Sequence, residues 1–243
     1  MTPPVRSIAL VRLSAIGDVV HALPLLHSIR TRYPEAKITW IIERAPWELI
    51  RGVEGVDEFV LFRRRPLLRG LLELRGELAG RRFDLVLTPQ PSAKAALVTA
   101  LLSSPRKIGF DRGRSPEFGW LVTPERIAAQ PVGHFAEEML EFADHLGAQR
   151  VERWGIGPTA EERRQWSPLV PDGHPLIALS VASSRPEKDW PAGRFAALAE
   201  RLVELHGAGI ILIGGRGERE DRLAAEIASR ASVPVRDLRA NDL

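Results

Sequence analysis

The chain has 243 residues, of which 44% are hydrophobic and 27% are charged, proportions that are typical of a folded globular protein with a sizeable core. It contains no cysteine, which excludes disulfide frameworks, thiolate metal sites and cysteine nucleophiles, and its formal net charge is only +3. No run of about 18 apolar residues occurs and the first residues lack a signal-peptide pattern, so we expect a cytoplasmic protein without a transmembrane helix.

Strands and helices alternate along the chain, which predicts an α/β fold with mostly parallel sheets. In the N-terminal part, strands are expected at Ile8–Leu13, Ile38–Ile42, Phe59–Phe62, Leu85–Thr88 and Lys107–Gly109. Helices are expected there at Val19–Tyr33, Trp47–Arg51, Leu67–Ala79, Ala93–Leu101 and His134–Leu146.

A single carboxylate follows the first strand. The apolar run Ser7–Val11 is typical of a parallel strand that is buried on both faces, and Leu13–Asp18 joins it to the first helix. Asp18 is therefore expected in the first turn of a helix at the carboxyl end of a strand, where α/β sheets bind ligands. Gly17 permits a tight turn and the close approach of a substrate. The alternative is that Asp18 only caps the helix.

Positive charge is concentrated between Phe62 and Arg82, a segment with seven arginines and two glutamates. Its densest part is Arg63-Arg64-Arg65. Such a patch indicates an anionic partner: phosphate groups, an acidic glycolipid or a membrane surface. The alternative is a solvated helix face on which glutamates pair with arginines. Nucleic acid is disfavoured, because no aromatic side chains interleave with the arginines to stack on bases.

Glycine and proline become frequent between residues 151 and 174, where we expect an interdomain linker with one short polar helix near residues 160–165. The linker separates an N-terminal Rossmann-like domain (1–150) from a second, partial one (175–243). In the second domain, strands are expected at Leu176–Ser180, Ile210–Ile213 and Val235–Leu238, and helices at Pro191–His206 and Glu218–Arg230. Because a three-stranded parallel sheet leaves an edge uncovered, we expect a domain that is truncated at its C-terminus.

The second domain has two strand-to-helix loops suited to a nucleotide. Hydroxyls of Ser183 and Ser184 with the ammonium of Lys188 precede a helix N-terminus, a combination that favours a diphosphate; the alternative is a merely solvated Lys188. After the next strand, Gly214–Gly217 permits close approach, and Glu218 is placed to accept hydrogen bonds from ribose hydroxyls. No Asp-x-Asp pair occurs, so the sequence does not support a carboxylate-held Mg²⁺, and no metal is expected.

On these residues the chain resembles glycosyltransferase family 9, the ADP-heptose:lipopolysaccharide heptosyltransferases, and is most similar to the type that adds the first heptose. The matching residues are Val11–Pro24, Tyr33-Pro34, Trp40–Glu43, Arg63–Arg65 and Lys188–Pro191 with Arg194-Phe195. The resemblance spans essentially the whole chain. It implies a GT-B architecture of two Rossmann-like, doubly wound domains, with the second one incomplete in this chain.

The resemblance also implies a function: inverting, metal-independent transfer of heptose from ADP-heptose to the lipopolysaccharide inner core, without a cofactor. Asp18 would be the general base. The residues implied to bind the donor are Ser183, Ser184, Lys188 and Glu218. Those implied to bind the acceptor are Arg63, Arg64, Arg65, Gln90, Lys94 and His21, the last with packing as its alternative role. The expected partners are an ADP-sugar, an anionic lipopolysaccharide core and the inner face of the cytoplasmic membrane.

The chain departs from the family pattern at two places. The Asp-Thr/Ser-Gly-x-x-His segment that completes the family's donor pocket does not occur, and Thr88–Pro91 stands where first-heptose enzymes have an Asp-Ala-Gln-Gly-like stretch. Two alternatives therefore stay open: a non-catalytic acceptor-binding fragment, or a family 9 transferase with a different sugar or acceptor. A nicotinamide-dependent oxidoreductase also fits the alternating pattern, but the chain lacks a dinucleotide fingerprint.

Overall fold

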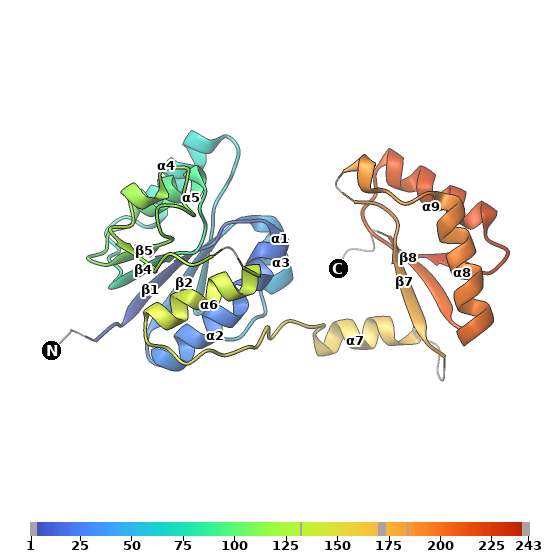
Figure 1. The fold of residues 1–243 in the computed structure, drawn as a ribbon, viewed down its shortest axis with the longest axis horizontal. Coiled ribbons are helices and arrows are strands. Elements are labelled where there is room, and N and C mark those ends of the chain that lie inside the picture. Colours follow the sequence, from blue (N-terminus) through green and yellow to red (C-terminus); the bar gives the residue numbers. More distant parts are fainter. Residues whose placement is uncertain (1–3, 132, 170–173, 184, 240–243) are drawn as a thin grey trace. The chain divides into compact units, whose positions relative to one another are not determined.

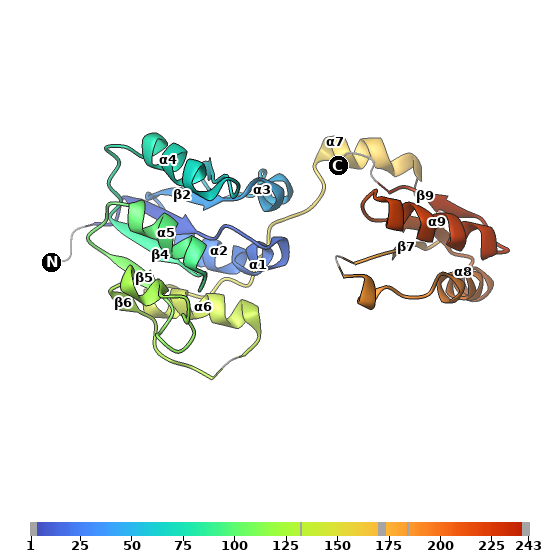
Figure 2. The same ribbon diagram turned by 90° about the horizontal axis from the view of Figure 1, so that it is seen from above.

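The computed structural model describes residues 4–131, 133–169, 174–183 and 185–239 (Figures 1 and 2). The chain divides into two compact units, Met1–Ile156 and Gly157–Leu243. This division lies inside the segment where the sequence predicts a linker. Each unit has its own parallel sheet.

The first unit contains a six-stranded parallel sheet in the order β3-β2-β1-β4-β5-β6. Its strands are β1 (Ser7–Val11), β2 (Lys37–Ile42), β3 (Glu58–Leu61), β4 (Leu85–Thr88), β5 (Lys107–Gly109) and β6 (Glu125–Arg126). This is the order of a doubly wound Rossmann sheet, in which the chain changes direction between β1 and β4. Ligands of such sheets bind outside the carboxyl ends of the strands at that point.

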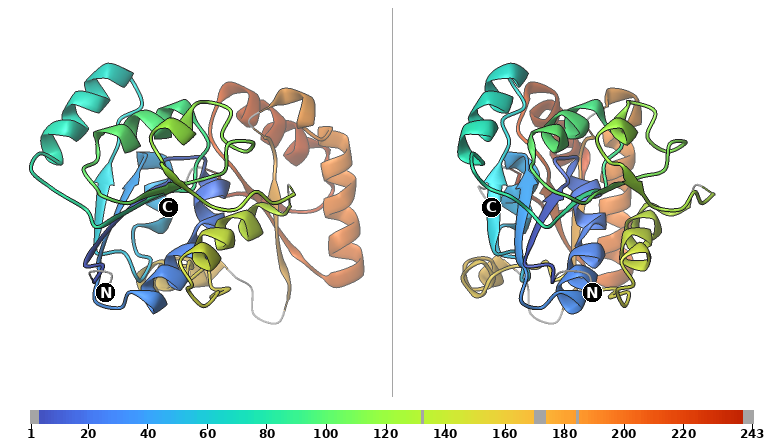
Figure 3. Two further views of the ribbon diagram at one scale, coloured as in Figure 1. Left: turned by 60° about the vertical axis from the view of Figure 1, so that its left-hand side comes forward. Right: turned by 90° about the vertical axis from the view of Figure 1, so that its left-hand side faces the viewer.

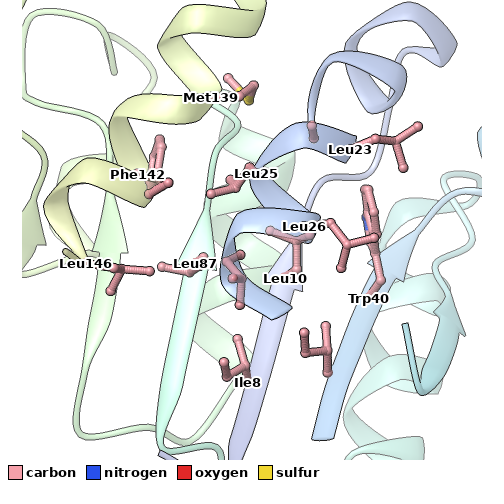
Figure 4. Close-up of a cluster of buried hydrophobic side chains, with 14 of the residues drawn as sticks. Ile8, Leu10, Leu23, Leu25, Leu26, Trp40, Leu87, Met139, Phe142 and Leu146 are labelled. Carbon is pink, nitrogen blue, oxygen red and sulfur yellow. The ribbon is translucent and has the colours of Figure 1, made fainter. Parts of the chain in front are cut away.

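The central strand β1 is buried on both faces, as its apolar run predicts. Ile8 and Leu10 enter one core with residues of the helices α2 and α6, and Ala9 and Val11 enter the other core, on the opposite face of the sheet. Figure 4 shows the first of these cores, where side chains of the two helices pack on the sheet. Alternate residues of one strand therefore hold both helical layers together.

Six helices of the first unit connect or cover these strands: α1 (Ile16–His21), α2 (Leu23–Arg32), α3 (Arg44–Ile50), α4 (Leu67–Glu77), α5 (Ala93–Leu101) and α6 (Phe135–His145). The prediction of one helix over residues 19–33 was wrong, because the structure has two helices that meet at Ala22. Pro24 has no backbone N–H to donate to the carbonyl of Val20, so a continuous helix would lack that bond. The short edge strand β6 was not predicted, since two residues carry no periodic signal.

The second unit contains a three-stranded parallel sheet in the order β7-β8-β9. Its strands are β7 (Leu176–Ser180), β8 (Gly209–Ile213) and β9 (Val235–Asp237), and its helices are α7 (Ala160–Trp166), α8 (Ala192–His206) and α9 (Glu218–Arg230). All of these were predicted to within about one residue, including the polar α7, which Thr159 begins with a capping box to Glu162. Within the described part of the chain, no helix is long and apolar enough to cross a membrane.

A glycine in α4 tests how closely this helix packs on its own unit. A Cβ at Gly70 would stand 1.9 Å from the carbonyl oxygen of Arg63, whereas a Cβ at Gly76 in the same helix would meet nothing within 4 Å. We expect Gly70→Ala to lower the free energy of urea unfolding by about 1–3 kcal/mol. The matched control Gly76→Ala should raise it by up to about 1 kcal/mol, the usual effect of alanine in a helix. Equal stability of the two variants would contradict the packing described here.

Candidate functional site

Polar side chains gather at the carboxyl end of the first unit's sheet, in the segments that follow β1, β2 and β4. The charged residues among them are Arg12, Asp18, Glu43 and Lys94, and their ion pairs join Arg12 to Asp18 and Lys94 to Glu43. They come from distant parts of the sequence, and the sheet order brings them together.

Asp18 lies in the first turn of α1, and its side chain is 43% exposed. Its Oδ2 accepts a hydrogen bond from the backbone N–H of Ala15 at 3.1 Å and lies 2.7 Å from Nη2 of Arg12. Asp18 therefore does help to cap the N-terminus of α1, through its bond to the backbone N–H of Ala15. Capping does not use up the carboxylate, because both contacts are on Oδ2, and no hydrogen bond to Oδ1 is formed by any residue that the structure describes.

Arg12 was given no role in the sequence analysis, although an arginine directly after a buried apolar strand is itself a signal. Its side chain is only 2% exposed. Nη1 donates to the carbonyl oxygen of Pro89 at 2.6 Å, and the guanidinium lies 5.1 Å from the ring centre of Phe135. Burial lowers the pKa of Arg12 from its ordinary value, and the neighbouring Asp18 opposes this shift. Arg12 thereby holds one oxygen of Asp18 in place.

Gln90 and Lys94 are both near Asp18 in this arrangement, but both already have partners within the fold. The side chain of Gln90 is buried, and its Oε1 accepts from the backbone N–H of Leu13 at 2.7 Å. Nζ of Lys94 pairs with Glu43 and donates to Oγ of Ser14 at 3.1 Å. These contacts hold the segment between β1 and α1 in place, directly before the helix turn that contains Asp18. An acceptor-binding role for either residue stays a prediction.

His21 lies one turn after Asp18 in α1. Its ring makes edge contacts with the rings of His134 and Phe135, at centroid distances of 5.5 and 5.8 Å. Nδ1 of His21 is buried without a hydrogen bond in the described structure. These contacts favour packing, which was one of its two expected roles.

The three consecutive arginines border a hollow of about 580 Å³. Its lining residues are Glu43, Arg44, Ala45, Leu61, Phe62, Arg63, Arg64, Arg65, Glu73 and Glu77. Because Glu43 also pairs with Lys94, this hollow adjoins the polar cluster around Asp18. Arg63 lies 3.6 Å from Glu73, whereas Arg64 and Arg65 form no ion pair with any described residue. The ion pair of Arg63 fits the interpretation of a solvated helix face with paired charges, and binding of an anion by Arg64 and Arg65 stays a prediction.

In the second unit, the loop after β7 contains the residues that are expected to bind a diphosphate. The backbone N–H of Ser183 donates to Asp189 at 3.0 Å, and the Ser183 hydroxyl donates to the carbonyl of Arg185 at 2.7 Å. Lys188 ends a short 3-10 turn and is exposed, without an ion pair in the part of the chain that is described. Ser184 lies outside the described residues.

Arg219 joins this loop to the one that carries Glu218, the first residue of α9. Its Nη1 lies 3.2 Å from Asp189, and its Nη2 donates to the carbonyl of Ser183. Because β7 and β8 are parallel neighbours, both predicted donor-binding loops leave the sheet on the same side. Sequence reasoning missed Asp189 and Arg219, which act between segments about 30 residues apart. In the described ranges, no three His, Asp or Glu residues are grouped so that they could hold a metal ion.

The chain is similar in sequence to known glycosyltransferases. The family model for glycosyltransferase family 9 (heptosyltransferase) matches residues 71–238. The lipopolysaccharide core heptosyltransferase OpsX of Haemophilus influenzae is 26% identical over 92% of this chain and 64% of its own length. Lipopolysaccharide heptosyltransferase 1 of Pseudomonas aeruginosa is 26% identical over 93% of this chain and 67% of its own length. The chain thus spans about two thirds of the length of these curated relatives.

Solved structures show the same fold. A family 9 glycosyltransferase from Veillonella parvula has a TM-score of 0.81 at 22% identity, covering 96% of this chain and 69% of that one. The Escherichia coli heptosyltransferase WaaC with ADP has a TM-score of 0.75 at 24% identity, covering 96% and 74%. The predicted fold class is confirmed by these likenesses and by the two parallel sheets. Since the family model matches more than half of its residues, the chain belongs to glycosyltransferase family 9, the heptosyltransferases.

Proposed function

We propose that this protein is an inverting, metal-independent glycosyltransferase that moves heptose from ADP-heptose to the lipopolysaccharide inner core. Residues 1–150 would bind the acceptor, and residues 175–243 would bind the nucleotide sugar. The observation that carries the proposal is the carboxylate of Asp18, which is partly exposed at the carboxyl end of β1 and held by Arg12 on one oxygen. Membership in the heptosyltransferase family supports the reaction class.

Asp18 is the general base of the proposed reaction. Oδ1 takes the proton of an acceptor hydroxyl as the hydroxyl oxygen attacks the anomeric carbon of the heptose. The attack comes from the side opposite the nucleotide, so a new glycosidic bond forms as the bond between that carbon and the diphosphate oxygen breaks. The electron pair of the broken bond leaves with ADP, and the configuration at the anomeric carbon is inverted. A base in position contributes about 10²–10⁴ to the rate of such a step.

The second unit supplies the donor site in this proposal. Lys188 and the hydroxyls of Ser183 and Ser184 bind the diphosphate, with the Ser183 hydroxyl exchanging its bond to the carbonyl of Arg185 for one to a phosphate oxygen. Lys188 offsets the negative charge that develops on the leaving ADP. Glu218 accepts hydrogen bonds from the ribose. ADP-heptose as donor is supported by the solved WaaC complexes, one with ADP and one with ADP-2-deoxy-2-fluoro heptose.

The first unit supplies the acceptor site. Arg63, Arg64 and Arg65 contact phosphate or carboxylate groups of the inner core, in the hollow that adjoins the Asp18 cluster. Gln90 and Lys94 hold the segment that leads into α1 and so position Asp18, and both residues also contact the acceptor. Because the acceptor is attached to a lipid, we place the reaction at the cytoplasmic face of the inner membrane, with the protein bound peripherally.

The general-base assignment is tested by Asp18→Asn, which removes the basic oxygen and keeps the shape of the side chain. We expect heptose transfer to a heptose-free core acceptor to slow by about 10²–10⁴, with the affinity for ADP unchanged. The control Glu137→Gln alters an exposed carboxylate on α6 that pairs with Arg150 and should keep full transfer. Near-normal transfer by Asp18→Asn would refute the assignment, and ADP binding without any transfer by the unaltered chain would favour a non-catalytic fragment.

The role of Arg12 as a positioning residue is tested by Arg12→Met and Arg12→Lys. Arg12→Met removes the contact to Asp18, and we expect kcat to fall by about 10² while KM for the donor stays the same. Arg12→Lys restores a positive charge beside Asp18 and should recover part of the loss. If KM for the donor rises and kcat is unchanged, Arg12 does not act through Asp18.

The diphosphate site is tested by Lys188→Ala. Loss of a charge-assisted hydrogen bond should weaken ADP binding about tenfold or more, as measured by isothermal titration calorimetry. The control Arg201→Ala removes an exposed cation of α8 that pairs with Glu204, and it should bind ADP like the unaltered chain. An unchanged Kd for Lys188→Ala would remove Lys188 from the site.

A further inference from the structure

The helix α4 has an apolar pair on the side that does not pack on its own unit. Gly70 and Leu74 are buried against the rest of the unit, whereas Leu68 is 71% exposed and Leu72 is 60% exposed. The two leucines are four residues apart and so lie one turn apart on the same face. Figures 2 and 3 draw α4, in blue-green, with one long side clear of the other elements of its unit.

Positively charged side chains lie beside this apolar pair and in the segment before the helix. With about 3.6 residues in each turn, positions 68, 72 and 75 share one side of the helix, so Arg75 stands beside the leucines. Arg64 and Arg65 precede the helix, are exposed, and like Arg75 form no ion pair within the described residues. Of the acidic side chains of α4, Glu73 is already paired with Arg69 and Arg63, and Glu77 lines the hollow with Arg64 and Arg65, about half a turn around the helix from Leu68. The side of α4 that carries the leucines thus combines bulky apolar side chains with the unpaired cation of Arg75, and the segment before it adds a net positive charge.

We propose that this surface, made of Leu68, Leu72, Arg64, Arg65 and Arg75 and named here the α4 surface, docks on an anionic phospholipid bilayer. The leucines enter the boundary between headgroups and acyl chains, and the arginines bind the negatively charged headgroups. Amphipathic helices bind membranes by this combination of apolar burial and attraction to anionic lipid.

A lipid surface fits these residues better than a protein partner. Two leucines are too small an apolar area for the core of a stable protein interface, which buries about 800 Å² on each side. An anionic bilayer supplies charge opposite to that of every unpaired arginine of the surface at the same time. The inference rests on the membrane location in the proposed function and names the surface that binds the bilayer. It can be tested apart from sugar transfer, because docking needs neither donor nor acceptor.

The test is sedimentation of the full chain with vesicles that contain no lipopolysaccharide. We expect binding to vesicles of phosphatidylcholine with about one third phosphatidylglycerol, weak binding to phosphatidylcholine alone, and release by high salt. Leu68→Gln with Leu72→Gln should weaken partitioning at least tenfold, and Arg75→Gln about fivefold. The control Leu205→Gln alters an exposed leucine of α8 and should bind like the unaltered chain.

A second measurement uses the absence of cysteine from the chain. In Leu72→Cys, a polarity-sensitive fluorophore on the new thiol should shift its emission to the blue when anionic vesicles are added, whereas the same label in Leu205→Cys should not. Equal binding to neutral and anionic vesicles, or an unshifted label at position 72, would overturn the proposal. So would a dimer in sedimentation equilibrium that the leucine substitutions dissociate, since the α4 surface would then bind a second copy. We expect Asp18→Asn to bind vesicles like the unaltered chain, which would show that docking does not depend on the proposed general base.

Discussion

The guanidinium of Arg12 lies in the interior of the first unit, where an uncompensated charge would cost several kcal/mol. The fold surrounds it with the carbonyl of Pro89 after β4, the ring of Phe135 at the start of α6 and the carboxylate of Asp18 in α1. Each of these groups belongs to a different element, so the buried charge requires that all three elements be in place. The carboxylate of Asp18, on which the proposed reaction depends, is one of these partners, so its position is set by the same buried charge.

The sheet order 3-2-1-4-5-6 determines which loops can meet around Asp18. β1 lies between β2 and β4, so the residues that follow all three strands share one edge of the sheet. Most polar groups at this edge satisfy one another: Gln90 holds Leu13, and Lys94 holds Glu43 and Ser14. Among the described residues, Oδ1 of Asp18 and the guanidiniums of Arg64 and Arg65 are left open near this edge, as are Nδ1 of His21, which is buried, and the carboxylate of Glu77. The first three of these are a base and two cations, the set that an anionic sugar acceptor would need.

One side of the helix α4 packs on its own unit, and the other side is exposed to solvent. Gly70 allows the helix to approach the backbone of Arg63 closely, and Leu74 fills the core, so the buried side sets the position of the basic segment before the helix. The other side carries Leu68 and Leu72 into solvent. If that side meets the membrane as proposed, the arginines that would bind the acceptor lie next to the lipid from which the acceptor extends.

Sequence patterns predicted the α/β class, nearly all of the strands and the position of Asp18 at a strand-to-helix junction, because burial periodicity and strand-end chemistry are local properties. They did not predict the break at Ala22, the strand β6 or the role of Arg12. Arg12 donates to Pro89 and Gln90 accepts from Leu13, and in each of these pairs the residues stand 77 apart along the chain, a separation that no local pattern encodes. Local patterns in the sequence were enough to place most strands and helices and to identify the charged residues. Which charges neutralise each other and which stay open follows from the fold, because pairing depends on distances that the sheet order creates.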